Sequence, residues 1–191
     1  MTDASTGAIA IGGSAGAVQA LLRLLPTLSA DFPAPILIVV HVPPDRENAL
    51  VPLFQGKCRI AVKEAEDKEP TTPGVAYFAP SDYHLLVEAD GTLSLSSDEL
   101  VNHSRPSIDV LFEAAADAFG GALTSIVLTG ANHDGAQGLK AVAGAGGVAL
   151  VQDPAGAYAA AMPTAAVEAC PEARVMSLDA IAAYLAGLEA A

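Results

Sequence analysis

Three short apolar runs, each leading to a reactive side chain, constrain the fold of this chain more than any other feature. The runs and their side chains are residues 9–13 with Ser14, 36–40 with His41, and 126–129 with Asp134. Short β-branched runs closed by glycine or proline are typical of buried parallel strands, whose carboxyl ends meet at one edge of an open α/β sheet. A serine, a histidine and an aspartate at one such edge are the parts of a hydrolytic triad. A serine hydrolase is therefore the leading hypothesis.

Strand and helix patterns alternate along the chain, which predicts a three-layer, doubly wound α/β fold with a mainly parallel sheet. The length of 191 residues suits a single domain. Helices are expected at 18–25, 108–119, 136–142 and 181–188, and further strands at 122–128, 148–151 and 174–176. The runs 75–79, 84–87 and 92–95 predict strands with a tight hairpin, which we expect to form an antiparallel insertion or edge of the same domain. We expect the charged segment 63–73 to be a solvated surface loop.

Composition excludes several classes of function. A net charge of −13 with only nine lysines and arginines argues against a nucleic-acid partner, because phosphate contacts need a basic surface. The longest strongly apolar run, residues 36–40, is too short to span a bilayer, so no membrane insertion is expected. No signal peptide is evident at the N-terminus, which makes the cytoplasm the default location. Cys58 and Cys170 lie in no metal-type spacing and cannot form a disulfide framework.

The glycine-rich turn around Ser14 has two functional interpretations. A dinucleotide-binding loop needs G-x-G-x-x-G, but Ser14 stands at the second required glycine, and His41 stands where the acidic ribose ligand would be. A nucleophile turn needs glycines flanking a serine, and Gly12-x-Ser14-x-Gly16 fits it. On the motif alone, a serine that merely caps the next helix is an equally good interpretation.

The other two side chains also have structural alternatives. A histidine that ends an aliphatic strand is more often a partly buried structural residue than a base, and Asp134 could be the N-cap of a helix starting at Ala136. His133 is a rival base, although sequence neighbours usually point apart. His84 and His103 are expected to serve structural or substrate-loop roles. Zinc is a further alternative, but no H-x-x-x-H or H-x-E pattern supports it, so no metal and no cofactor are expected.

Several longer segments point together to one family. They are residues 11–16, 41–43, 77–85, 103–112, 128–130 with 134–138, 152–153, and 162–163. In this order they resemble the catalytic domain of the chemotaxis protein-glutamate methylesterases, the CheB family, over nearly the whole chain. The resemblance implies that Ser14 is the nucleophile, His41 the base, and Asp134 its orienting carboxylate. The chain order Ser, His, Asp differs from that of the α/β-hydrolases, which argues against an ordinary lipase or esterase.

The resemblance also suggests the surroundings of the reacting atoms, with departures in two loops. The family usually has Ser-Thr-Gly-Gly where this chain has residues 14–17, and Gly-Met-Gly-x-Asp-Gly where it has 130–135. We expect Ala15 and Ala131 at the oxyanion and substrate site, with the N–H of Ala131 as an oxyanion donor, and Arg105 and Met162 in substrate binding. Arg105 would hold the site loops or an acidic receptor helix. Asn132, in a glycine position, is tolerated if that position is left-handed.

By this resemblance, the chain removes methyl esters from glutamate side chains of a methylated chemoreceptor or similar signalling protein, and also deamidates glutamine. The alternative is a retasked or non-catalytic regulatory module that keeps the fold and binds a protein partner. Family members commonly carry an N-terminal phospho-acceptor receiver domain. Because the catalytic motif starts by Ile9, we expect residues 1–191 to be one catalytic domain with no receiver domain, regulated by a separate phospho-regulated receiver protein or not at all.

Overall fold

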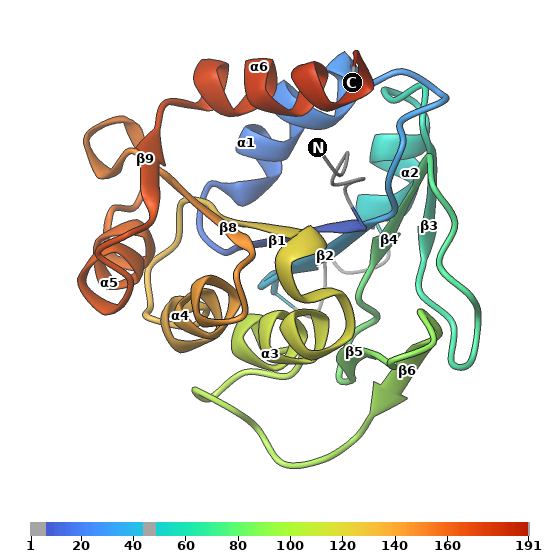
Figure 1. Cartoon of the computed structure of the whole chain (residues 1–191), viewed down its shortest axis with the longest axis horizontal. Helices are drawn as coiled ribbons and strands as arrows, with labels where there is room; N and C mark the ends of the chain where they lie inside the picture. The colour runs from blue at the N-terminus through green and yellow to red at the C-terminus, as the bar shows by residue number, and fades with distance from the viewer. Residues whose placement is uncertain (1–6, 44–48, 191) are drawn as a thin grey trace.

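Seven parallel strands form the central sheet of the computed structural model, which describes residues 7–43 and 49–190 (Figure 1). The strand order is β3-β4-β2-β1-β7-β8-β9. The bounds are β1 Ala8–Gly13, β2 Ile36–Val40, β3 Ala61–Glu64, β4 Val75–Phe78, β7 Leu123–Val127, β8 Val148–Gln152 and β9 Arg174–Met176. The predicted doubly wound, mainly parallel fold is confirmed. Residues 1–6, on which the expectation about export rests, lie outside the described residues.

Helices cover both faces of the sheet (Figure 1). On one face lie α1 (Ala17–Leu24) and α6 (Leu178–Glu189), and on the other α3 (Ile108–Phe119), α4 (Ala136–Gly144) and α5 (Ala161–Ala169). The short α2 (Leu50–Gln55) packs beside β3. Because alternate residues of a strand point to opposite faces, β1 sends Ile9 and Ile11 into the core under α1 and Ala8 and Ala10 into the core under α3. No helix in the described part of the chain is long and apolar enough to cross a membrane.

The predicted hairpin is present, but one of the three strands grouped with it belongs elsewhere. Strands β5 (His84–Val87) and β6 (Leu93–Ser96) pair antiparallel as a separate two-stranded sheet, which packs on α3. The assignment of residues 75–79 to this antiparallel part is wrong, because β4 pairs in parallel with both β2 and β3. The run from Ala76 to Phe78 is buried on both faces, as expected of an interior strand.

The predicted surface loop 63–73 is wrong at its start. Lys63 and Glu64 belong to β3, which lies at the edge of the sheet. An edge strand has one free side, so charged residues are tolerated there and mask its strand pattern. Only Val62 of this strand points fully inward.

The winding of the chain reverses at β1, which pairs with β2 on one side and with β7 on the other. Open α/β sheets bind their ligands at such a switch point, outside the carboxyl ends of the strands. The start of α3 packs closely against the end of β1, because Gly12 has no side chain. A Cβ built on Gly12 would lie 2.3 Å from Cγ2 of Ile108. The segments that follow β1, β2 and β7 therefore meet in one crevice, beside the start of α3.

Candidate active site

Ser14 lies in the turn that joins β1 to α1. Its backbone N–H donates to the carbonyl of Thr129 at 2.9 Å, which ties this turn to the loop after β7. Gly16 is the N-cap of α1 with φ 84°, and a Cβ there would lie 2.7 Å from Cβ of Tyr158, so both conformation and space favour glycine. No side chain caps α1. The alternative in which Ser14 is a helix cap is therefore wrong.

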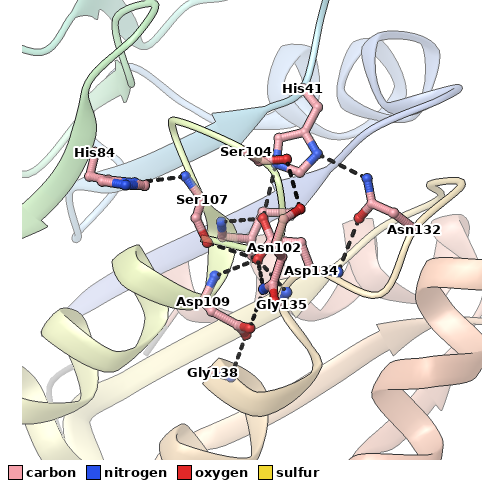
Figure 2. Close-up of polar contacts among 11 residues, drawn as sticks. His41, His84, Asn102, Ser104, Ser107, Asp109, Asn132, Asp134, Gly135 and Gly138 are labelled. Atoms are coloured by element: carbon pink, nitrogen blue, oxygen red, sulfur yellow. Dashed lines mark hydrogen bonds and ion pairs between the residues drawn. The ribbon is translucent and has the colours of Figure 1, made fainter. Parts of the chain in front are cut away.

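His41 follows β2 directly, and its N–H donates to the carbonyl of Gly13 at 3.0 Å. Its ring is mostly buried, with Nε2 3.0 Å from Oδ2 of Asp134 and Nδ1 3.3 Å from Nδ2 of Asn132 (Figure 2). Nε2 and Oδ2 of Asp134 are not aligned for a hydrogen bond, so the two atoms form a close polar contact. One ring nitrogen thus faces the carboxylate and the other faces Asn132.

Asp134 is fully buried and caps a helix, although not the one suggested by the sequence. Its carboxylate accepts hydrogen bonds from the hydroxyl of Ser107 at 2.8 Å and from the N–H groups of Ile108 and Asp109 at 2.7 and 3.1 Å, in the first turn of α3 (Figure 2). The N-cap of α4 is Gly135. Burial alone would raise the pKa of Asp134, but contacts with His41, Ile108 and Asn102 hold the pKa below its ordinary value. The site therefore contains a buried carboxylate that is ionised at neutral pH.

A second buried carboxylate, Asp109, was not identified from the sequence. It accepts the N–H of Gly138 at 2.6 Å, and Nδ2 of Asn102 at 2.7 Å. Burial raises the pKa of Asp109, and the charge of Asp134 adds to the rise. A sequence signal existed: Asp109 lies three residues before Phe112, on the apolar stripe of its helix, where an acid is exceptional.

Hydrogen bonds on both ring nitrogens fix His84 beneath the site. Nδ1 of this almost fully buried ring accepts the N–H of Ser107 at 3.1 Å, and Nε2 donates to the carbonyl of Glu99 at 2.8 Å. Of the structural and substrate-loop roles expected for His84, this geometry favours the structural one. His103 lies between Glu99 and Ser107 in the chain and has a φ of 61°.

The loop after β7 is held by two side chains that the sequence did not single out. Thr129 accepts the N–H of Ala159 at 2.8 Å, with its hydroxyl 2.9 Å from the carbonyl of Ala15. Gln152 accepts the N–H of Thr129 at 2.8 Å. Met162 is fully buried, and its N–H donates to the carbonyl of Gly130 at 2.9 Å. The position of Met162 suits support of the loop, with no exposed surface to offer a substrate.

The loops after β1 and β7 each offer a backbone N–H donor. Within residues 7–43 and 49–190, no acceptor is found for the N–H groups of Ala15 and Ala131. Asn132 is not among the residues with positive φ, so the left-handed conformation that would make asparagine tolerable in a glycine position is absent. Its side chain instead accepts the N–H of Asp134 at 3.0 Å. The loop therefore accommodates asparagine through a local hydrogen bond and not through an unusual backbone.

Arg105 joins two loops beside the site. Its Nε and Nη2 donate to one carboxylate oxygen of Asp82 at 3.0 and 2.6 Å, and its Nη1 lies 2.9 Å from the carbonyls of Ser97 and Asp98. Each guanidinium nitrogen thus has a partner within the chain. Of the two roles expected for Arg105, the geometry favours the holding of loops.

Two cavities meet at His41. Ser14, Ala15 and His41 line one of about 340 Å³, whose apolar wall includes Leu50 and Leu53. The other, of about 230 Å³, lies between His41 and the segment that contains residues 103–106. Among the described residues, no group of three His, Cys, Asp or Glu side chains could hold a metal ion. The polar groups of the site include the hydroxyl of Ser14, the imidazole of His41, the carboxylate of Asp134 and backbone N–H groups.

The fold and this edge of the sheet together define a doubly wound α/β domain of the hydrolase class. Comparison with known proteins makes the assignment narrower. The family model for CheB methylesterase matches residues 9–185. This chain belongs to the CheB methylesterase family.

The individual relatives agree with this assignment. A Leptospira interrogans protein, named provisionally as a protein-glutamate methylesterase/protein-glutamine glutaminase, is 49% identical over 92% of this chain and 91% of its own length. A Caulobacter vibrioides protein-glutamate methylesterase/protein-glutamine glutaminase is 38% identical over 94% of this chain, which spans 53% of that relative. The crystal structure of the Thermotoga maritima CheB methylesterase catalytic domain superposes with a TM-score of 0.91 at 31% identity, over 98% of this chain and 100% of that one.

Proposed function

We propose that this chain hydrolyses glutamate γ-methyl esters on a chemoreceptor-like signalling protein, with Ser14, His41 and Asp134 as its catalytic residues. One observation carries the proposal: His41 stands in contact with a buried carboxylate and shares a cavity with Ser14. The names of the relatives, which specify a protein-glutamate methylesterase/protein-glutamine glutaminase, support the choice of substrate.

The proposed reaction is acyl transfer in two steps. Oγ of Ser14 attacks the ester carbonyl carbon while its proton passes to Nδ1 of His41, the ring nitrogen turned away from Asp134. The ionised carboxylate of Asp134 stabilises the imidazolium that forms. The C–O bond to the methoxy group then breaks, and methanol leaves with the proton from His41. Water attacks the acyl-enzyme by the same route, giving glutamate and free Ser14.

The oxyanion of the tetrahedral intermediate needs preorganised donors. The N–H groups of Ala15 and Ala131 are the proposed ones. Ala15 follows Ser14 in the chain, Ala131 precedes Asn132, which contacts His41, and neither N–H has an acceptor among the described residues. An amide carbonyl passes through the same intermediate, so glutamine deamidation, with ammonia as the leaving group, is part of the proposal. Because the donors are backbone groups, the change from the family's methionine to Ala131 leaves the N–H in place.

Regulation and location complete the proposal. We place the protein in the cytoplasm, where the signalling domain of a chemoreceptor would be its substrate. A separate phospho-regulated receiver protein is the proposed regulator. The chain spans about half the length of the Caulobacter relative.

The test is methanol release from a chemoreceptor fragment that carries glutamate γ-methyl esters. The purified chain should release methanol, and Ser14→Ala should not, while both bind the fragment equally. Ammonia release from the same fragment with glutamine at these sites tests deamidation. Binding without release of either product would favour the alternative, a regulatory module that has kept the fold but not the chemistry.

A further inference from the structure

Asn132 makes two hydrogen bonds that together determine how its side-chain amide is turned. Its Oδ1 accepts the N–H of Asp134 at 3.0 Å, and its Nδ2 lies 3.3 Å from Nδ1 of His41 (Figure 2). Turning the amide over would place its NH₂ group against the N–H of Asp134, two donors face to face. The backbone of Asp134 therefore fixes the orientation in which Asn132 presents a donor to the imidazole.

The tautomer of His41 follows from this orientation. A donor from Asn132 requires a lone pair on Nδ1, so the proton of the neutral ring is on Nε2, next to the carboxylate of Asp134. Nδ1 is also the nitrogen that has to receive the proton of Ser14 in the proposed reaction. Asn132 and the serine hydroxyl thus compete for one lone pair.

The competition becomes repulsion as the reaction proceeds. When Nδ1 takes the proton, the N–H of the imidazolium and the NH₂ group of Asn132 are both donors. Asn132 cannot present its oxygen instead without abandoning the N–H of Asp134. The contact seen in the resting protein therefore opposes the proton transfer and must break during it.

We propose that Asn132 is a positioning residue that restrains His41 in an unreactive hydrogen bond, so that removal of its amide speeds the reaction. This inference rests on the proposed function, because it assigns Nδ1 as the base. A long, half-buried hydrogen bond is weak, so the expected effect is an increase in kcat of roughly three- to tenfold with KM unchanged.

Two variants separate the contact with His41 from the support of the loop. The hydroxyl of Asn132→Ser can still accept a backbone N–H two residues on, as serine does in such turns, but it presents no amide to the ring. Asn132→Ala removes both interactions. The restraint predicts a higher kcat for methanol release in both variants. A purely structural role predicts wild-type kcat for Asn132→Ser and a lower kcat for Asn132→Ala, and that result, or no increase in either, would overturn the proposal.

A spectroscopic measurement tests the contact without turnover. Nitrogen NMR of the His41 ring, recorded in a Ser14→Ala background at a pH where the ring is neutral, should show a protonated Nε2 and a hydrogen-bonded, unprotonated Nδ1. The Nδ1 resonance should shift when Asn132→Ser is added to the Ser14→Ala background. An enzyme that hydrolyses the ester but has Nδ1 protonated refutes this inference alone. If the tautomer is the expected one but neither the wild type nor any variant with Ser14 hydrolyses the ester, the proposed function is refuted, and the restraint with it.

Discussion

The carboxylates of Asp109 and Asp134 are bridged by one side-chain nitrogen: Nδ2 of Asn102 lies 2.7 Å from Oδ2 of Asp109 and 2.8 Å from Oδ1 of Asp134. The pKa values of the two acids are shifted in opposite directions. Burial raises the pKa of Asp109, whereas the contacts with His41, the start of α3 and Asn102 overcome burial and lower the pKa of Asp134. Asp134 can therefore remain charged beside His41, while Asp109 accepts a proton more readily.

This difference predicts a pH-dependent effect of Asp109→Asn. Because the folded-state pKa of Asp109 is raised, its contribution to stability is fully present below the unfolded value of about 3.9 and is lost as pH rises through the folded value. The variant has no such group, so its stability should improve relative to wild type as pH rises from about 4 to 7. Urea unfolding across this range measures the difference, and a gap that does not vary with pH would contradict the prediction.

Ser14→Ala should abolish activity without disturbing the fold. The hydroxyl of Ser14 makes no hydrogen bond to the described residues, so its removal should leave Tm unchanged. Loss of a nucleophile in a comparable triad lowers kcat by roughly 10⁶-fold, and we expect a loss of at least about 10³-fold. Methanol release and thermal unfolding of the same preparation test both parts. Activity near that of wild type would eliminate Ser14 as the nucleophile.

Asp134→Asn should differ from Ser14→Ala by losing both activity and stability. By analogy with other triads, kcat should fall roughly 10³- to 10⁴-fold. An amide nitrogen would also face donors from the first turn of α3, and we expect the free energy of unfolding to fall by about 1–3 kcal/mol.

The stability part of this prediction depends on pH. Since the folded-state pKa of Asp134 is lowered, the wild-type advantage is present above the unfolded value of about 3.9 and disappears as pH falls through the folded value. Urea unfolding at several pH values is the measurement, with Ser14→Ala as the matched control. Equal stability of wild type and Asp134→Asn at pH 7 would show that the carboxylate does not hold α3.

Arg105→Ala should raise KM several-fold while global stability stays unchanged, because the arginine joins exposed loops rather than core elements. Arg105→Lys distinguishes the two roles considered for this residue. A lysine keeps the charge but cannot span Asp82 and the carbonyls of Ser97 and Asp98 together. The loop role predicts that lysine fails to restore KM and that Asp82→Asn raises KM in the same direction. Recovery of wild-type KM in Arg105→Lys would indicate instead that the charge meets the substrate.

The sequence was sufficient to predict the parts of the site that depend on strand ends. Apolar runs locate β1, β2 and β7, and their carboxyl ends locate Ser14 and His41 in one crevice. The edge strand β3 and the interior strand β4 were missed or misplaced because their role depends on neighbours that are distant in the chain. Pairing across a sheet is decided by tertiary context, which local pattern does not contain.

The supporting residues could not be predicted for a similar reason. Asn102, Thr129 and Gln152 are ordinary polar residues in the sequence, and their importance lies in hydrogen bonds to segments 7 to 114 residues away. Asp109 alone carried a local sign, an acid on a buried helical stripe. The departure at Asn132 was visible in the sequence, but its contact with His41 was not.

The double use of Asp134, as neighbour of His41 and as cap of α3, has a consequence for the evolution of this fold. A descendant that abandons chemistry can exchange Ser14 at little cost, since its hydroxyl has no hydrogen bond to the described residues, whereas His41 still contacts the buried carboxylate of Asp134. Such a descendant cannot exchange Asp134 without leaving the N–H groups at the start of α3 with no acceptor. Under the proposed function, an aspartate at this position would mark ancestry, and the serine and histidine would report whether a given descendant still works as an enzyme.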